Sequence, residues 1–196
     1  EGIPQNLDNQ KPEFIEEFFS TMQFVMAGND TQGLRYGTIE TPETHYTQWK
    51  EENPAYDPSD PTANKYLSPT SCEESNGRLD CALARLVNPK RLLELIHDFI
   101  VFDSGTKIVA RHNQYFGVKA ARKSVEREQD GIIWHSQGAG KSLVMVWLAK
   151  WILESDPDAR VLIVTDRTEL DEQIEGVFQG VGEDIARIRN GKVRDR

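Results

Sequence analysis

A glycine-rich loop between two apolar runs, at residues 131–142, constrains the fold of this chain more than any other feature. Its sequence, GIIWHSQGAGKS, passes from a short apolar run through glycines to a lysine and a hydroxyl. Gly138 and Gly140 let backbone N–H groups close around phosphate oxygens. A helix that starts near Lys141 points the positive end of its dipole at the same place. The pattern therefore predicts a phosphate-binding loop.

The residue types of this loop suggest a role for each position. A lysine such as Lys141 reaches the β- and γ-phosphates of a nucleotide, and a hydroxyl such as that of Ser142 binds Mg²⁺. Lys141 is therefore the candidate catalytic residue and Ser142 the candidate metal ligand, with ATP and Mg²⁺ as the expected cofactors. The candidate nucleotide-binding residues of the loop are Ser136, Gln137, Gly138, Ala139, Gly140, Lys141 and Ser142.

The loop departs from the general pattern at one position. The pattern G-x-x-x-x-G-K-[ST] has glycine where this chain has His135. A glycine-rich turn that precedes a helix by chance is the alternative interpretation. The flanking sequence favours the phosphate loop, because it predicts a strand before the loop and a helix after it.

The flanks predict an α/β arrangement. Residues 131–134 and 160–165 are apolar runs typical of buried strands, and residues 143–153 suit a core-facing helix between them. Strand, helix and strand in this order imply a parallel pair joined by a right-handed crossover. Trp134, Trp147 and Trp151 are interpreted as core residues.

Apolar spacing and turn residues predict further elements along the chain. Strands at 21–26 and 34–39, separated by a turn cluster, are typical of a hairpin. Residues 41–70, rich in Pro, Asn, Asp and Glu, indicate a surface loop. The predicted helices cover residues 11–20, 80–87, 90–99, 111–128 and 169–178.

Charge is distributed unevenly along the sequence. The chain carries a net charge of −9, yet residues 1–105 contain 8 Lys and Arg against 18 Asp and Glu, whereas residues 106–196 contain 15 against 14. The acidic first half suits a protein partner better than DNA. A basic cluster at residues 119–123 can contact phosphates, although such clusters are more often solvated helix faces. No apolar run has the length of a membrane span.

Four sequence segments occur in an order that is typical of one enzyme family. They are LRYG at residues 34–37 with Trp49 downstream, RHNQYF at 111–116, the loop at 131–142, and VLIVTDRTELDEQ at 161–173. With them the chain resembles the restriction (R) subunit of type I restriction-modification enzymes, which couples a nuclease domain to a superfamily 2 helicase-like motor. The resemblance covers most of the chain and is strongest over residues 107–178. The form H-x-x-G-x-G-K-S is similar to the loop of this family.

The resemblance implies roles for residues outside the loop. Gln114 corresponds to a glutamine that reads adenine, because a carboxamide can both donate to and accept from the adenine edge; a surface glutamine is the alternative. Asp166, Arg167 and Gln173 correspond to contacts with the DNA backbone. Asp166 and Thr168 also suit the cap of the following helix, and both interpretations can hold together.

The resemblance also implies the organisation of the chain. The expected fold is part of a RecA-like P-loop motor lobe with parallel strands at residues 106–196. The end of an α/β nuclease-type domain at 1–50 and a helical connector at 51–105 precede it. The expected function is that of the central part of a subunit that translocates and cleaves DNA with ATP, inactive as this segment alone. Double-stranded DNA and the methyltransferase and specificity subunits are the expected partners, in the cytoplasm and without a membrane.

Two motifs of that family are missing from the 196 residues. Its nuclease site is an Asp followed by Glu-x-Lys, and no lysine here has Asp or Glu two residues before it. Gln48 and Lys50 with Asp30 are a weak variant, and the spacing of Gln32 and Tyr36 is interpreted as coincidence. The motor's Asp-Glu-x-His motif is also absent. Two alternatives therefore remain, a superfamily 2 helicase or remodelling ATPase without a nuclease, and a non-catalytic docking module.

Overall fold

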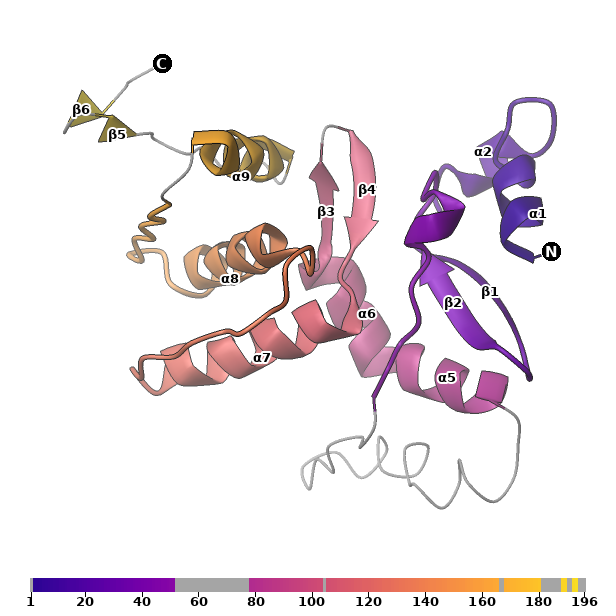
Figure 1. Ribbon diagram of the computed structural model, residues 1–196, viewed down its shortest axis with the longest axis horizontal. Coiled ribbons are helices and arrows are strands. Elements are labelled where there is room, and N and C mark those ends of the chain that lie inside the picture. Colours follow the sequence, from indigo (N-terminus) through magenta and orange to yellow (C-terminus); the bar gives the residue numbers. More distant parts are fainter. Residues whose placement is uncertain are drawn as a thin grey trace. The chain divides into compact units, whose positions relative to one another are not determined.

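The computed structural model describes residues 2–51, 78–103, 105–165, 168–180, 188–189 and 192–193. The chain divides into two compact units, Glu1–Ile100 with Lys107–His112 and Val101–Thr106 with Asn113–Arg196. Figure 1 shows helices and short strands, and the described residues form three two-stranded sheets, β1-β2, β3-β4 and β5-β6. The fold is therefore mixed α/β with short sheets. Most of the predicted surface loop, residues 52–70, lies outside the described residues.

The first unit opens with two helices and a hairpin. Helices α1 (Gly2–Asn9) and α2 (Glu16–Phe19) precede β1 (Val25–Asn29) and β2 (Gly33–Gly37). The strands are antiparallel, with Val25 opposite Gly37, so the predicted hairpin is confirmed. Helix α1 was not predicted, and α2 is much shorter than the predicted helix at 11–20.

The turn of the hairpin follows from its residues. The Asn29 side chain accepts hydrogen bonds from the backbone N–H groups of Thr31 and Gln32, at 3.0 and 2.7 Å. Gly33 then takes a positive φ of 76°, which a residue with a Cβ atom adopts only at a cost. Asparagine and glycine at these positions therefore set the reversal of the chain.

Two helices complete this unit at the predicted places. They are α5 (Arg78–Leu86) and α6 (Pro89–Asp98). The Asn88 side chain accepts from the N–H groups of Lys90 and Arg91 at the start of α6, and proline occupies its first turn, where no N–H is needed. The short 3₁₀ turn η1 (Glu43–His45) falls within the predicted loop.

The side chain of Tyr36 is fully buried in the first unit. Its ring lies 6.2 Å from that of Trp49, centroid to centroid, and its hydroxyl donates to the carbonyl oxygen of Ala110 at 3.0 Å. Burial raises the pKa of this phenol well above its usual value. Leu86, Leu95 and Phe99 are fully buried as well. Tyr36 therefore acts as a core residue with a satisfied polar end.

Strands β3 (Ile100–Asp103) and β4 (Thr106–Val109) form the second sheet. Neither strand was among the elements predicted from the sequence. Strands β5 (Ile188–Arg189) and β6 (Lys192–Val193) pair antiparallel as the third sheet. Each sheet is too short to form a layer on its own.

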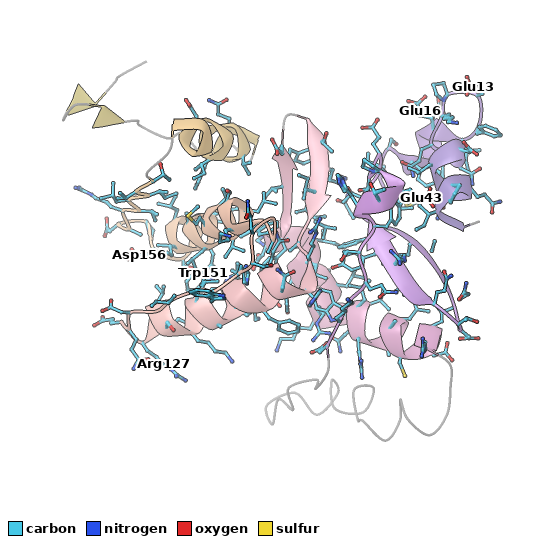
Figure 2. All side chains as sticks on the ribbon, in the orientation of Figure 1. Glu13, Glu16, Glu43, Arg127, Trp151 and Asp156 are labelled. Atoms are coloured by element: carbon cyan, nitrogen blue, oxygen red, sulfur yellow. The ribbon has the colours of Figure 1, made fainter. Side chains whose placement is uncertain are left out.

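Three helices dominate the second unit. They are α7 (His112–Glu126), α8 (Lys141–Ser155) and α9 (Thr168–Gly180), close to the predicted positions. Helix α8 lies between the other two (Figure 1). Most of its side chains are apolar, as expected for a helix that packs in a core, and Trp147 is fully buried, as predicted. The half-buried Trp151 faces α7, where the Arg122 guanidinium lies 5.2 Å from its ring centroid (Figure 2).

The two predicted parallel strands are not strands in the structure. Residues 131–134 and 160–165 make no strand pairing with any described residue. Ile132 and Trp134 are 91% and 90% exposed, and Val164 is 81% exposed. The prediction that Trp134 is a core residue is therefore wrong. Apolar sequence predicts a buried strand only when neighbouring strands supply hydrogen bonds and a covering layer.

No helix of the described chain is long and apolar enough to cross a membrane.

Candidate phosphate-binding site

The predicted phosphate loop precedes a well-formed helix. Helix α8 begins at Lys141, and Gly140 is its N-cap, with a left-handed backbone (φ 74°, ψ 42°). Glycine has no side chain, so the N-cap residue makes no side-chain hydrogen bond to the N–H groups of the first turn. The start of α8 therefore presents backbone donors that its N-cap leaves uncapped, beside the positive end of its dipole.

The two glycines of the loop have different surroundings. Gly138 also has a positive φ, 76°, and a Cβ atom added there would meet no described atom within 4 Å. A Cβ atom added at Gly140 would instead collide with Nε2 of Gln114. Glycine at 138 is thus needed only for the left-handed backbone conformation. Glycine at 140 is needed for that conformation and also to leave space for the Gln114 side chain.

Gln114 joins helix α7 to the loop. Its side chain is 3% exposed, and its Nε2 donates to the carbonyl oxygens of Ala139 and Gly140 at 3.1 and 3.3 Å. The structure therefore brings Gln114 together with the loop residues, as expected for one site. The contact that it makes here is with the loop backbone.

Lys141 folds back over the loop that precedes it. Its Nζ donates to the carbonyl oxygens of Ser136 and His135, at 3.1 and 3.3 Å. The lysine side chain is solvent-exposed. A flexible ammonium group held by two neutral carbonyl oxygens is well placed to exchange them for phosphate oxygens, which carry charge.

His135, at the position where the general pattern has glycine, packs against α7. A Cβ atom added at Gly117 would lie 3.2 Å from Cε1 and from Nε2 of the imidazole. The Nδ1 atom of His135 is buried and has no hydrogen-bond partner among the described residues. Sequence reasoning missed Gly117, although an isolated glycine within a helical pattern indicates a close approach of another group.

The structure describes the remaining predicted site residues to different extents. Ser136 and Gln137 are exposed, and Ser142 is half-buried in the first turn of α8. Asp166 and Arg167 lie outside the described residues. Gln173 belongs to α9, but its side chain is not described.

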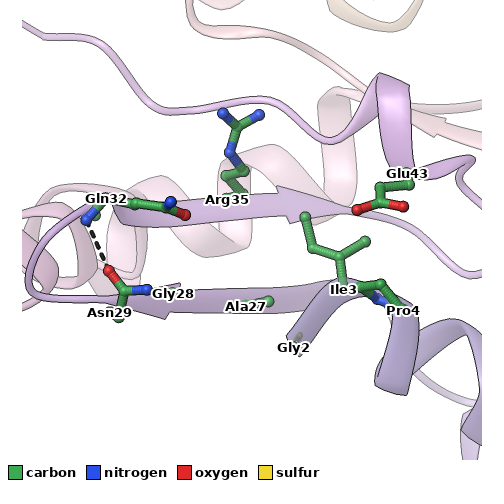
Figure 3. Close-up of a pocket in the computed structure, with 10 residues that line it drawn as sticks. Gly2, Ile3, Pro4, Ala27, Gly28, Asn29, Gln32, Arg35 and Glu43 are labelled. Atoms are coloured by element: carbon green, nitrogen blue, oxygen red, sulfur yellow. Dashed lines mark hydrogen bonds between the residues drawn. The ribbon is translucent and has the colours of Figure 1, made fainter.

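Two hollows accompany these elements. One, of about 430 Å³, lies in the second unit between α7, α8 and residues 131–135 and is lined by apolar and small side chains such as Ala121 and Trp134. The other, of about 360 Å³, lies beside the β1-β2 hairpin, with Arg35 and Glu43 at its wall (Figure 3). Neither belongs to the loop at 136–140.

Asp30, Gln48 and Lys50, the weak variant of the nuclease motif, do not belong to a cluster of metal ligands among the described residues. The described residues contain no group of three or more His, Cys, Asp and Glu side chains that could hold a metal ion. Gln48 donates to the carbonyl oxygen of Gln32 at 2.9 Å. Tyr36 is part of the core described above.

Comparison with known proteins adds to this geometry. A family model described as SWI2/SNF2 ATPase matches residues 113–194. The HindI endonuclease subunit of a type I restriction enzyme from Haemophilus influenzae is 28% identical over 204 aligned residues, which cover 96% of this chain and 18% of that protein. The MjaIXP type I endonuclease subunit of Methanocaldococcus jannaschii is 40% identical over 124 residues, 57% of this chain and 12% of that protein.

The MjaVIIP type I endonuclease subunit of the same organism is 32% identical over 114 residues. The chain spans less than a fifth of the length of these relatives, since it covers 12%, 18% and 11% of them. The matched ATPase region lies in the second half of the chain, and one alignment includes nearly all of the chain. The chain is therefore a homologue of the endonuclease (R) subunits of type I restriction enzymes.

Proposed function

We propose that this chain carries the ATP phosphate-binding loop of a subunit that translocates and cleaves DNA with ATP. One observation carries the proposal. The glycine loop, the uncapped start of α8 and the Lys141 ammonium meet at one point. The match of residues 113–194 to SWI2/SNF2 ATPases supports the same role.

The residues of the loop fit a nucleotide phosphate chain. The open side of Gly138 leaves room for phosphate oxygens, to which the first N–H groups of α8 would donate. Lys141 would neutralise part of their charge, and the Ser142 hydroxyl would hold a Mg²⁺ ion. When bound, ATP would supply the phosphoryl group, and Mg²⁺ would offset the charge that develops on it.

Other expected residues extend this proposal beyond the loop. Gln114 is proposed to read adenine when a nucleotide is bound, since its amide already lies at the loop. Asp166, Arg167 and Gln173 are proposed to contact the DNA backbone. The proposed partners are double-stranded DNA and the methyltransferase and specificity subunits, in the cytoplasm. Glu13, Glu16 and Glu43 are exposed on the first unit (Figure 2), which suits a protein partner better than DNA.

The exposed apolar segments support a RecA-like lobe. The most exposed apolar side chains of the two segments, Ile132 with Trp134 and Leu162 with Val164, lie two residues apart, the spacing that places side chains on one face of a strand. Exposed continuous apolar runs of this kind suit inner strands whose neighbours are supplied by other parts of the intact subunit. We therefore propose that both segments pair in a parallel sheet in the intact subunit.

Binding of Mg-ATP by the 196-residue chain tests the proposed loop. We expect weak binding, at least about tenfold weaker in Lys141→Ala, because one charge-assisted contact to phosphate is lost. Lys123→Ala, which removes an exposed lysine from α7, is the control and should bind as the wild type does. Equal binding by wild type and Lys141→Ala would overturn the assignment.

The SWI2/SNF2 match also favours a second candidate, a translocating or remodelling ATPase without a nuclease. An intact protein with this motor half would then move on DNA and leave it uncut. DNA cleavage by the intact protein in the presence of ATP distinguishes the two candidates. We expect the 196-residue chain by itself neither to hydrolyse ATP at a useful rate nor to cleave DNA, because the Asp-Glu-x-His motif is not part of it.

A further inference from the structure

Helix α7 contacts the phosphate loop at two points, one near each end of the loop. Gln114 and Gly117 are three residues apart on α7 and therefore lie on the same face of the helix. Gln114 donates to the carbonyl oxygens of Ala139 and Gly140, where the loop ends. Gly117 faces the imidazole of His135, where the loop begins.

The contact at Gly117 is a close fit between a backbone and a ring. A Cβ atom there would come within 3.2 Å of two imidazole atoms and within 3.8 Å of Cγ2 of Ile133, and ordinary contacts to a Cβ atom are longer than the first distance. Glycine is among the poorest helix formers, so a glycine in the middle of a 15-residue helix indicates a packing requirement.

The Nδ1 atom of the imidazole is buried without a hydrogen-bond partner among the described residues. The backbone of the same residue matters to the site, because its carbonyl oxygen accepts from Nζ of Lys141 at 3.3 Å. Displacement of His135 would therefore also move an acceptor of the lysine that is proposed to bind phosphate.

We propose that His135 and Gly117 are a matched pair that positions the phosphate loop, the glycine making room on α7 for the ring that replaces the usual first glycine. This inference rests on the proposed function. It assigns His135 a positioning role and makes α7, through Gln114 and Gly117, the element that sets the geometry of both ends of the loop.

A double-mutant cycle on the full 196-residue chain tests the pair. Dissociation constants for Mg-ATP and for Mg-tripolyphosphate are measured for wild type, Gly117→Ala, His135→Gly and the double variant. We expect Gly117→Ala to weaken the binding of both ligands by a similar factor of about three to ten, because the loop contacts the phosphate groups that both ligands contain. The double variant should bind no more weakly than His135→Gly, since the ring that the new methyl group would crowd is gone.

Gly176→Ala is the matched control. Gly176 lies within α9, and a Cβ atom there meets no described atom within 4 Å. This variant therefore changes helix propensity without introducing a new side-chain contact. Thermal unfolding without nucleotide should not fall in Gly117→Ala, because alanine favours the helix. A purely structural role would instead lower the midpoint together with the affinity.

Each outcome supports or overturns the inference. Wild-type affinity in Gly117→Ala, or independent additive losses in the double variant, would overturn the matched pair. If Lys141→Ala weakens binding while Gly117→Ala does not, the pair fails and the proposed phosphate loop stands. If the wild type binds neither ligand, both proposals fail.

Discussion

The side-chain amide of Gln114 occupies the space into which a Cβ atom of residue 140 would project, and its Nε2 donates to the carbonyl oxygen of Gly140 at 3.3 Å. The glycine therefore serves two purposes. It allows the left-handed backbone that starts α8, and it lets a helix distant in sequence reach the loop. A comparison of Gly140→Ala with Gly138→Ala should separate the effect of backbone strain from that of a steric collision with Gln114.

Gly140→Ala should abolish detectable Mg-ATP binding, whereas Gly138→Ala should weaken it only severalfold. Both variants place alanine at a positive φ, 74° or 76°, which costs roughly 1–2 kcal/mol. Only at position 140 does the new methyl group also collide with Gln114. Calorimetric titration of the two variants measures the difference, and equal affinities would show that the contact with Gln114 is unimportant.

Gln114→Glu should weaken Mg-ATP binding by about tenfold or more. A carboxylate cannot donate to the carbonyl oxygens of Ala139 and Gly140 and repels them instead. Asn113→Asp adds the same charge one residue earlier on α7 and should have little effect. The ratio of ATP to GTP affinity is measured as well. Loss of the preference for ATP in Gln114→Glu supports adenine reading, and an unchanged ratio contradicts it.

Arg91→Met should destabilise the first unit by about 3 kcal/mol, within the range for breaking a buried pair. The Arg91 guanidinium donates to both carboxylate oxygens of Glu51, at 2.8 and 3.0 Å, and the Glu51 side chain is 4% exposed. Trp49 Nε1 donates to the same carboxylate at 3.0 Å. Removal of the arginine thus leaves a buried charge without its main partner. Urea unfolding followed by tryptophan fluorescence measures the loss.

The control for that experiment is the exposed ion pair between Lys11 and Asp8. Their Nζ and Oδ1 atoms lie 2.6 Å apart, but both side chains are more than half exposed, at 56% and 54%. Lys11→Met should therefore change the unfolding midpoint little, because water and salt screen the pair. A loss in Lys11→Met as large as that in Arg91→Met would contradict the argument from burial.

Protonation of His112 should contribute to acid destabilisation. Burial, and then the nearby Lys50 ammonium, lowers the pKa of its imidazole below the usual 6.5, although a hydrogen bond with the Gln48 backbone opposes the shift. The imidazole takes up a proton near pH 6.5 in the unfolded chain and only at lower pH in the folded chain. The contribution of neutral His112 to the free energy of unfolding is therefore fully present above pH 6.5, and it is lost as the pH falls through the folded-state pKa.

The measurement is the free energy of unfolding between about pH 5 and pH 8. His112→Gln should show a smaller decrease than the wild type toward low pH, because glutamine does not titrate. Parallel curves for the two proteins would show that His112 does not contribute.

Much of the secondary structure could be predicted from local patterns. The hairpin follows from the turn around Asn29 and Gly33, and α6 follows from Asn88 and Pro89 at its start. The candidate site could be predicted in part, since Gln114 and the loop do meet. The strands at 131–134 and 160–165 could not be predicted correctly, because an apolar run does not show whether pairing partners are present.

The sequence by itself determined the loop with left-handed glycines, the helix that begins at Lys141 and the turn of the hairpin. Backbone conformation at glycine and the supply of capping groups depend on residues a few positions apart. The tertiary structure decided that Gln114 reaches Ala139 across 25 residues and that Glu51 meets Arg91 across 40. It also decided that His135 rests on Gly117. Such contacts depend on how helices pack in three dimensions, which no local spacing of residues encodes.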